Sequence, residues 1–172
     1  MNIVFYVTGA IAVIATMLTI TRVNAVHALL YLILSLLSIA VVFYTLGAPF
    51  VAALEVIVYA GAIMVLFLFV VMMLNLGPRA SREQLMWAPG TWVGAGVLAM
   101  ILLGELLYAM VSGGDGRLLG GNAIDPKAVS VSLFGPYLLG VELASMLLLA
   151  GLVGAYHLGR REPPEEEIPG DV

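Results

Sequence analysis

The sequence is poor in the residues on which soluble and redox-active proteins depend. Its 172 residues include no cysteine, which excludes thiolate-bound iron–sulfur clusters, disulfides and thiol nucleophiles. Charged residues make up only 10% of the chain, against roughly 25% in an average soluble domain, and no basic patch for nucleic acid is found. So few charges cannot cover the surface of a water-soluble fold.

Long apolar stretches take the place of charge. Hydrophobic residues make up 62% of the chain, and the mean hydropathy is +1.10. A lipid bilayer admits only helices or closed barrels, and these apolar runs are much longer than the alternating segments of about ten residues in barrel strands. The sequence therefore predicts an all-α integral membrane protein that is surrounded by lipid.

Five segments are long enough to cross a membrane, which takes about 20 mostly apolar residues. We expect one transmembrane domain over residues 1–160, with spans near 2–20, 26–46, 50–76, 90–111 and 134–158. Polar or helix-breaking residues separate the spans, namely Arg22 and Asn24, Gly47 and Pro49, the stretch 77–83, and the glycine-rich stretch 112–126. The first two links are predicted to be tight hairpins.

Basic residues predict the orientation, because cytoplasmic loops carry an excess of Lys and Arg. One side of the membrane would hold Arg22, Arg79, Arg82, Arg160 and Arg161, and the other side only Arg117 and Lys127. We therefore expect a periplasmic N-terminus and a cytoplasmic C-terminus. The acidic, proline-containing segment 161–172 is too polar to fold by itself, so we expect a disordered cytoplasmic tail.

Three acids lie inside the predicted spans: Glu55, Glu105 and Glu142. An ionisable group at the centre of a bilayer costs about 2.5–3.5 kcal/mol, so each needs a partner or a cavity lined by protein. Glu105 and Glu142 can be explained by snorkelling or by pairing with neighbouring subunits, and we assign no role to Glu105. Glu55 is the stronger functional candidate.

Glu55 is followed four residues later by Tyr59, so the carboxyl and the phenol share one face of a helix. Tyr59 is also the one tyrosine that lies deep in a span, although a core tyrosine bonded to a neighbouring helix would look the same. Ala60, Gly61 and Ala62 follow. Small residues in mid-helix indicate either close helix packing, which is the more common reason, or a local departure from α-helical hydrogen bonding.

Two further patterns are weaker. His27 and His157 lie near the cytoplasmic ends of two spans and could in principle ligate a haem or a metal, but no further histidine completes such a site. We expect them to anchor or hydrogen-bond at the interface, and we expect no metal or cofactor in this chain. The glycines of residues 113–121 match no nucleotide-binding motif.

The order of residues in two long blocks resembles a known family. AVHALLYLILSLLSIAVVFYTLGAPFVAALEVIVYAGAIMVLFLFVVMMLNL (25–76) and LFGPYLLGVELASMLLLAGLVGAYHLGR (133–160) are similar to the J subunit, of ND-six type, of bacterial NADH:quinone oxidoreductase, respiratory complex I. The resemblance implies a five-helix subunit of the bacterial inner membrane, near the junction of the two arms and next to the small A, K and H subunits.

The resemblance also implies what the chain does. The assembled complex uses NADH, FMN, iron–sulfur clusters and quinone, whereas this subunit carries no redox cofactor and no catalytic centre. The family's third helix has a π-bulge near its tyrosine, which matches Tyr59 and residues 61–65 here, and this helix links quinone reduction to proton translocation. The candidate coupling residues are accordingly Glu55, Tyr59, Gly61, Ala62, Val65 and, in the last span, Glu142.

Two other functions fit the same residues. The chain could serve in a multisubunit cation/proton antiporter or a membrane-bound hydrogenase, whose membrane modules are related to those of complex I. It could also be a purely structural subunit that holds the membrane arm together. Identification of the enzyme that co-purifies with the chain separates the first alternative from the leading hypothesis.

Overall fold

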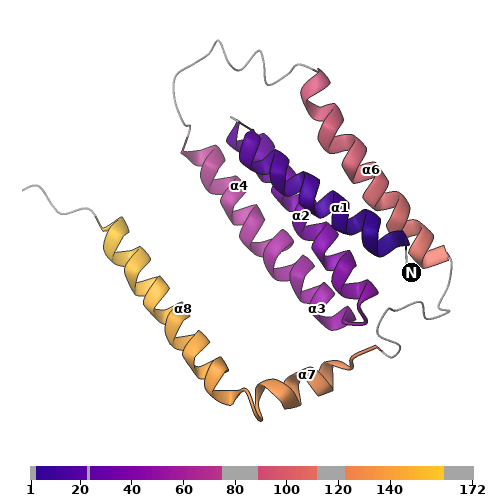
Figure 1. Cartoon of the computed structure of the whole chain (residues 1–172). Coiled ribbons are helices and arrows are strands. Elements are labelled where there is room, and N and C mark those ends of the chain that lie inside the picture. The colour runs from indigo at the N-terminus through magenta and orange to yellow at the C-terminus, as the bar shows by residue number, and fades with distance from the viewer. Residues whose placement is uncertain (1–2, 23, 75–88, 112–122, 161–172) are drawn as a thin grey trace, which may run out of the picture. The chain divides into compact units, whose positions relative to one another are not determined.

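The computed structural model describes residues 3–22, 24–74, 89–111 and 123–160, and every regular element within these ranges is a helix (Figure 1). The predicted tail, 161–172, and most of the glycine-rich loop lie outside the described residues. The chain divides into two compact units, Met1–Asp125 and Pro126–Val172. The expected all-α class is confirmed.

The first unit is built around α2. Its elements are α1 (Ile3–Thr21), α2 (Ala25–Thr45), α3 (Pro49–Leu54), a π-helix η1 (Glu55–Ile63), α4 (Met64–Met73) and α6 (Pro89–Val111). The segments α3, η1 and α4 follow one another without a break and form one long rod. Helix α2 packs against α1, against all three parts of this rod and against α6 (Figure 1).

The predicted breaks between the first spans are confirmed. Asn24 caps α2, since its side-chain oxygen accepts hydrogen bonds from the backbone N–H groups of Val26 and His27. Gly47 has a φ of 86°, a left-handed conformation that glycine adopts without steric cost, and it ends α2. Pro49 then occupies the first position of α3, where its missing N–H is not needed.

Two features of the second unit differ from the prediction. Residues 126–133 form a short helix, α7 (Pro126–Leu133), and the last long helix, α8 (Leu138–Gly159), begins four residues later than expected. The turn between them contains Gly135 and Pro136. A Cβ on Gly135 would lie 2.7 Å from the backbone oxygen of Val131, so the chain must bend at a glycine there. Composition could not reveal α7, which is too short and too polar to be a span.

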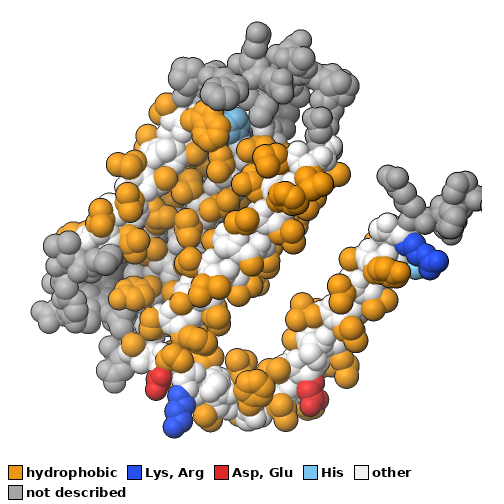
Figure 2. Space-filling model, turned by 180° about the vertical axis from the view of Figure 1, so that it is seen from behind, with side chains coloured by type: hydrophobic (Ala, Val, Ile, Leu, Met, Phe, Trp, Pro, Cys, Tyr) orange, Lys and Arg blue, Asp and Glu red, His pale blue; other side chains and the backbone are white. Residues whose placement is uncertain are grey.

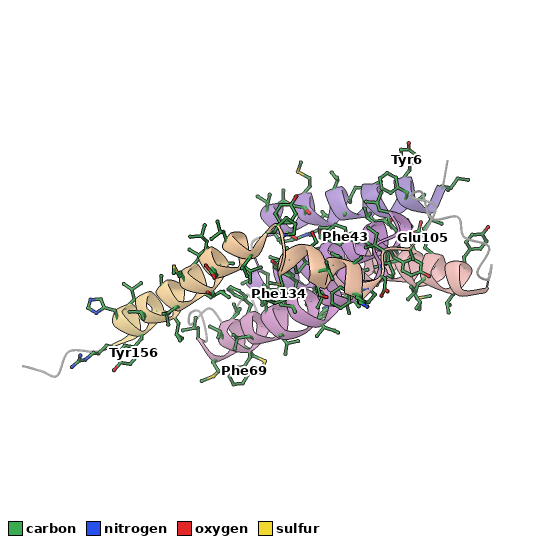
Figure 3. The ribbon with its side chains drawn as sticks, turned by 90° about the horizontal axis from the view of Figure 1, so that it is seen from below. Tyr6, Phe43, Phe69, Glu105, Phe134 and Tyr156 are labelled. Atoms are coloured by element: carbon green, nitrogen blue, oxygen red, sulfur yellow. The ribbon has the colours of Figure 1, made fainter. Side chains whose placement is uncertain are left out.

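Four segments are long and apolar enough to cross a membrane: Ile3–Thr21, Ala25–Thr45, Pro49–Met73 and Leu138–Gly159. The apolar part of α6 is shorter, from Trp92 to Tyr108. Hydrophobic side chains dominate the surface of these helices (Figure 2), and aromatic side chains such as Tyr6 and Phe69 project outward (Figure 3). A surface of this kind is expected where lipid or other membrane helices replace water.

The core of the first unit is small and lies between α1, α2 and α6. Ala15, Tyr31 and Leu34 are buried there, and Leu18, Ala95, Leu98 and Ala99 pack against them. A hydrogen bond of 2.8 Å between the hydroxyls of Thr16 and Ser35 joins α1 to α2. Small residues and interhelical hydroxyl bonds of this kind hold membrane helices together where the hydrophobic effect cannot.

Candidate functional site in the third span

The π-helix η1 is the feature that distinguishes the third span from the other helices. In a π-helix each N–H bonds to the carbonyl five residues earlier rather than four, and such segments are frequent at functional sites. At the end of η1 the N–H of Met64 bonds to the carbonyl of Tyr59, five residues before it. The element covers Glu55, Tyr59, Gly61 and Ala62, so four of the candidate residues lie in one irregular segment.

Gly61 fits this irregular backbone closely. A Cβ at Gly61 would lie 3.0 Å from the backbone oxygen of Val56, the residue five positions earlier. Such a contact is tighter than normal van der Waals packing and would force the carbonyl of Val56 to move. Of the two interpretations of the small residues 60–62, the departure from α-helical bonding is thus observed, in agreement with the family resemblance.

Glu55 and Tyr59 are close in sequence but are not bonded to each other. Glu55 is half-buried, and Tyr59 is 50% exposed on the surface of the chain. Neither side chain makes a hydrogen bond to any residue that the structure describes. The surface of this chain therefore leaves both groups of the pair accessible.

Tyr59 lies in the middle of the third span, but it is not the tyrosine that the chain itself buries. Tyr31 is the buried one, with 1% of its surface exposed, and its hydroxyl lies next to Gly94 of α6. The guanidinium of Arg22 stacks on the Tyr31 ring at 5.2 Å from its centroid. Sequence alone could not identify the contact between Tyr31 and Gly94, because these two residues are far apart in the chain.

The remaining candidates lie outside η1. Val65 belongs to the regular helix α4, one residue beyond its start, and is 59% exposed. The irregular stretch, which was expected at 61–65, begins and ends earlier in the chain, since the π-helix runs from Glu55 to Ile63. Glu142 belongs to α8 in the second unit, where its side chain is exposed and its backbone oxygen accepts a 2.7 Å hydrogen bond from Ser145.

No cofactor site is visible in the part of the chain that the structure describes. There is no group of three or more His, Asp or Glu side chains that could hold a metal ion among these residues. His27 instead packs edge-on against Trp92, with ring centroids 5.1 Å apart, and His157 lies in the last turn of α8. His27 is therefore packed inside the first unit, with 6% of its surface exposed.

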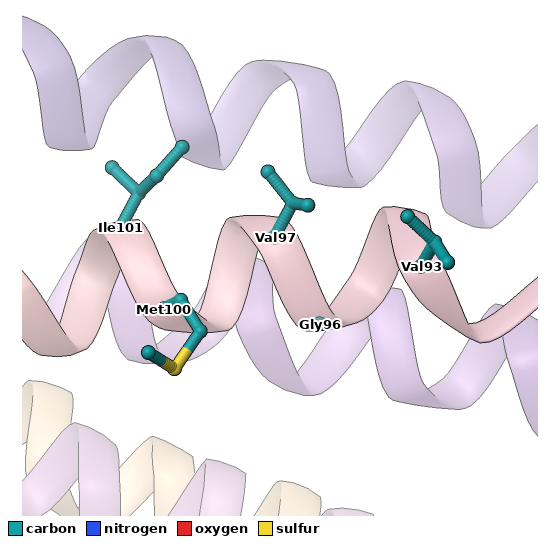
Figure 4. Close-up of a pocket in the computed structure, with 5 residues that line it drawn as sticks. All are labelled: Val93, Gly96, Val97, Met100 and Ile101. Carbon is teal, nitrogen blue, oxygen red and sulfur yellow. The ribbon is translucent and has the colours of Figure 1, made fainter.

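One depression lies on the surface of α6 (Figure 4). It is lined by residues of that helix alone: Val93, Gly96, Val97, Met100 and Ile101. These residues offer no polar side chain that could bind a polar group or move a proton. The depression is therefore a contact surface for apolar groups and is no candidate for chemistry.

The chain is similar to known proteins over nearly its whole length. Residues 15–158 match the family model of NADH-ubiquinone/plastoquinone oxidoreductase chain 6. The chain belongs to this family. A relative from Pseudomonas aeruginosa, named NADH-quinone oxidoreductase subunit J, is 59% identical over 163 residues, which cover 94% of this chain and 98% of the relative.

Two further relatives of the same name support the assignment. The protein of Escherichia coli strain K12 is 56% identical over 169 residues, covering 98% of this chain and 91% of its own length. The protein of Buchnera aphidicola subsp. Schizaphis graminum is 48% identical over 163 residues, covering 94% and 99%. The chain thus shares nearly its full length with these relatives. The residues that match the family model include the whole of η1.

Proposed function

We propose that the chain is the J subunit of a proton-pumping NADH:quinone oxidoreductase and that its third span couples quinone reduction to proton translocation. The family assignment and the printed names of the relatives support the first part. The π-helix η1 carries the second part, because it makes the middle of one membrane span irregular around an acid and a tyrosine.

In this proposal the subunit lies in the membrane arm of a complex in the bacterial inner membrane. Helix α6 forms the fourth of five crossings, the N-terminus is periplasmic and the C-terminus cytoplasmic, as the distribution of Lys and Arg favours. The small A, K and H subunits are the nearest neighbours. NADH, FMN, iron–sulfur clusters and quinone belong to the other subunits, since this chain offers no thiolate to hold a cluster.

The mechanism depends on two hydrogen-bonding registers of the same segment. A π turn contains more residues than an α turn, so conversion of η1 to regular α-helix would rotate α4 relative to α3. It would also swing Tyr59 about the helix axis relative to Glu55. A water chain between these two side chains could then form in one register and break in the other. The segment η1 would thus be the two-state element that coupling between distant sites requires.

The exposed position of Tyr59 and the half-buried position of Glu55 fit this role. Both groups are open to water or to carboxylates of neighbouring subunits, and a carboxyl in a membrane span marks a proton path more often than a structural contact. Ala62 and Val65 lie on the segment that would turn, and Glu142 supplies a further acid on α8. Protons pass through these groups and neighbouring subunits, while electron transfer occurs elsewhere in the complex.

The decisive experiment replaces Gly61 by Leu and Tyr59 by Phe in the complete complex in native membranes. The bulky side chain at position 61 meets the carbonyl of Val56 and should bias η1 away from its present register. NADH:quinone turnover and the number of protons pumped per NADH are measured. We expect both to fall in Gly61→Leu, and the pumping ratio to fall in Tyr59→Phe. Normal values in both variants would refute a coupling role for η1.

A matched control is available on α6. A Cβ at Gly104 meets no atom within 4 Å and Gly104 does not line the depression on α6, so Gly104→Ala should leave turnover and pumping unchanged. Glu55→Gln separates coupling from scaffolding. A scaffold would lose assembled complex on native gels but keep normal turnover per assembled complex, whereas a coupling residue would lose pumping within the complex that does assemble. Co-purification of an antiporter instead of a quinone-reducing enzyme would contradict the proposed assembly.

A further inference from the structure

Glu105 lies on α6, outside η1, and the family resemblance assigns it no role. Among the side-chain oxygen and nitrogen atoms that are closed off from solvent in the described residues, two have no hydrogen-bond partner. One is the hydroxyl of Tyr31 and the other is Oε2 of Glu105. An enclosed, unpartnered carboxylate oxygen is far more costly than an unpartnered hydroxyl, because it carries charge.

The enclosed oxygen results from the position of Glu105 on α6. The side of α6 that packs against α1 and α2 includes Leu98 and the buried Leu102, and Glu105 comes three residues after Leu102 on the same face. The side chain of Glu105 (labelled in Figure 3) thus continues the packed face of α6. Snorkelling does not account for this, since one carboxyl oxygen stays within the unit.

No positive charge is available on the facing helices to balance a carboxylate there. The helices that face α6, α1 and α2, contain no Lys or Arg, and their only histidine, His27, is in contact with Trp92. Trp92 is about 20 Å from Glu105 along α6 at the rise of an α-helix. A carboxylate at Glu105 would therefore have no positively charged partner on α1 or α2.

Three buried hydroxyls on the facing helices have their protons engaged within their own helix. Thr8, Ser38 and Thr45 each donate to a backbone oxygen of their own helix, at 2.6–2.8 Å. Their oxygens retain lone pairs that can accept a hydrogen bond. These three hydroxyls are thus left as acceptors, whereas the unpartnered Tyr31 hydroxyl lies next to Gly94, about 16 Å from Glu105 along α6. A carboxylic acid, which carries its own proton, suits an enclosed oxygen without a donor better than a carboxylate, which can only accept.

We propose that Glu105, on the face of α6 that packs against α1 and α2, is a second proton-binding site of this chain, separate from Glu55. Because Oε2 is covered by the chain itself, neither lipid nor a neighbouring subunit can reach it without a movement of the helices. A proton is small enough to bind Oε2 in this enclosed position. The other carboxyl oxygen, Oε1, is not enclosed, so a proton can be exchanged between it and the surface of the chain.

Infrared difference spectroscopy of the complete complex in membranes tests this site. A protonated carboxyl has a C=O stretch that is distinct from the bands of a carboxylate and shifts in D2O. We expect this band in the wild-type complex and its loss in Glu105→Gln. Leu106→Gln, next to Glu105 and 46% exposed, adds an amide at the same depth and should retain the band. An unchanged spectrum in Glu105→Gln, or the loss of carboxylate bands instead, would overturn the proposal.

Glu105→Asp keeps the test decisive if the glutamine variant does not assemble. The shorter acid should retain the protonated band at a shifted frequency, whereas an identical spectrum would show that the band arises elsewhere. Tyr59→Phe should leave the Glu105 band unchanged, because this site does not depend on the register of η1. Failure of the coupling proposal therefore remains distinguishable from failure of the Glu105 site.

Discussion

The contact between Tyr31 on α2 and Gly94 on α6 predicts two substitutions that compensate for each other. A Cβ added at Gly94 would lie 2.5 Å from the Tyr31 hydroxyl oxygen and 3.7 Å from its ring carbon Cζ. The first distance is a severe overlap and the second is normal van der Waals contact. Tyr31 is 1% exposed and stacked beneath Arg22, so its ring has little room to move aside. Gly94→Ala should therefore be harmful only while the hydroxyl is present.

The magnitude follows from the two parts of the change. Overfilling a packed site costs about 1–3 kcal/mol, while alanine in place of glycine in a helix gains about 1 kcal/mol. Gly94→Ala should thus lower the free energy of unfolding by up to about 2 kcal/mol. Tyr31→Phe removes an unpartnered buried hydroxyl and should be neutral or stabilising. In the Tyr31→Phe background, Gly94→Ala should no longer destabilise, which gives a coupling energy of about 1–3 kcal/mol.

The assay is a double-mutant cycle on the purified chain in detergent micelles, with unfolding by SDS followed by circular dichroism. The four proteins of the cycle are compared under one condition, so that helix propensity cancels in the coupling energy. Equal destabilisation by Gly94→Ala with tyrosine and with phenylalanine at position 31 would refute the steric argument. Gly104→Ala on the same helix serves as the control, because a Cβ there meets no atom within 4 Å.

Two further predictions concern the packing and the turns of the first unit. Ser35→Ala removes the 2.8 Å bond to Thr16 and should lower the free energy of unfolding by about 0.6–1.7 kcal/mol in the same SDS titration. A change within experimental error would mean that these groups find equally favourable hydrogen bonds in the unfolded chain. Gly47→Ala, at a φ of 86°, should cost about 1–2 kcal/mol, and stability equal to wild type would contradict the left-handed turn.

The sequence predicted most of the helical architecture for a simple physical reason. A span must be long and apolar, and a break between spans must contain a residue such as Gly47 or Pro49 that cannot continue the helix. Both requirements are local, so they can be read without knowledge of the fold. The same logic failed at α7, which is neither long nor apolar, and at the start of α8, where Gly135 and Pro136 delay the helix.

The candidate site was predicted in part. Glu55, Tyr59 and Gly61 stood out because an acid, a phenol and a small residue in an apolar run are locally unusual. The π-helix that contains them matches the family resemblance, but its bounds, Glu55–Ile63, depend on how the whole span bonds and packs. The family assignment itself could also be made from residue order, since two long blocks of the chain carry it.

By itself, the sequence determined that this chain inserts into a membrane as helices, where most of them begin and end, and to which family it belongs. These properties follow from hydropathy, helix-breaking residues and residue order, which act over short distances along the chain. Tertiary structure decided which polar groups lose contact with the surroundings. Tyr31 is enclosed between α1, α2 and α6, and Oε2 of Glu105 is closed off from solvent by the folded chain. Burial by distant segments leaves no local pattern in the sequence.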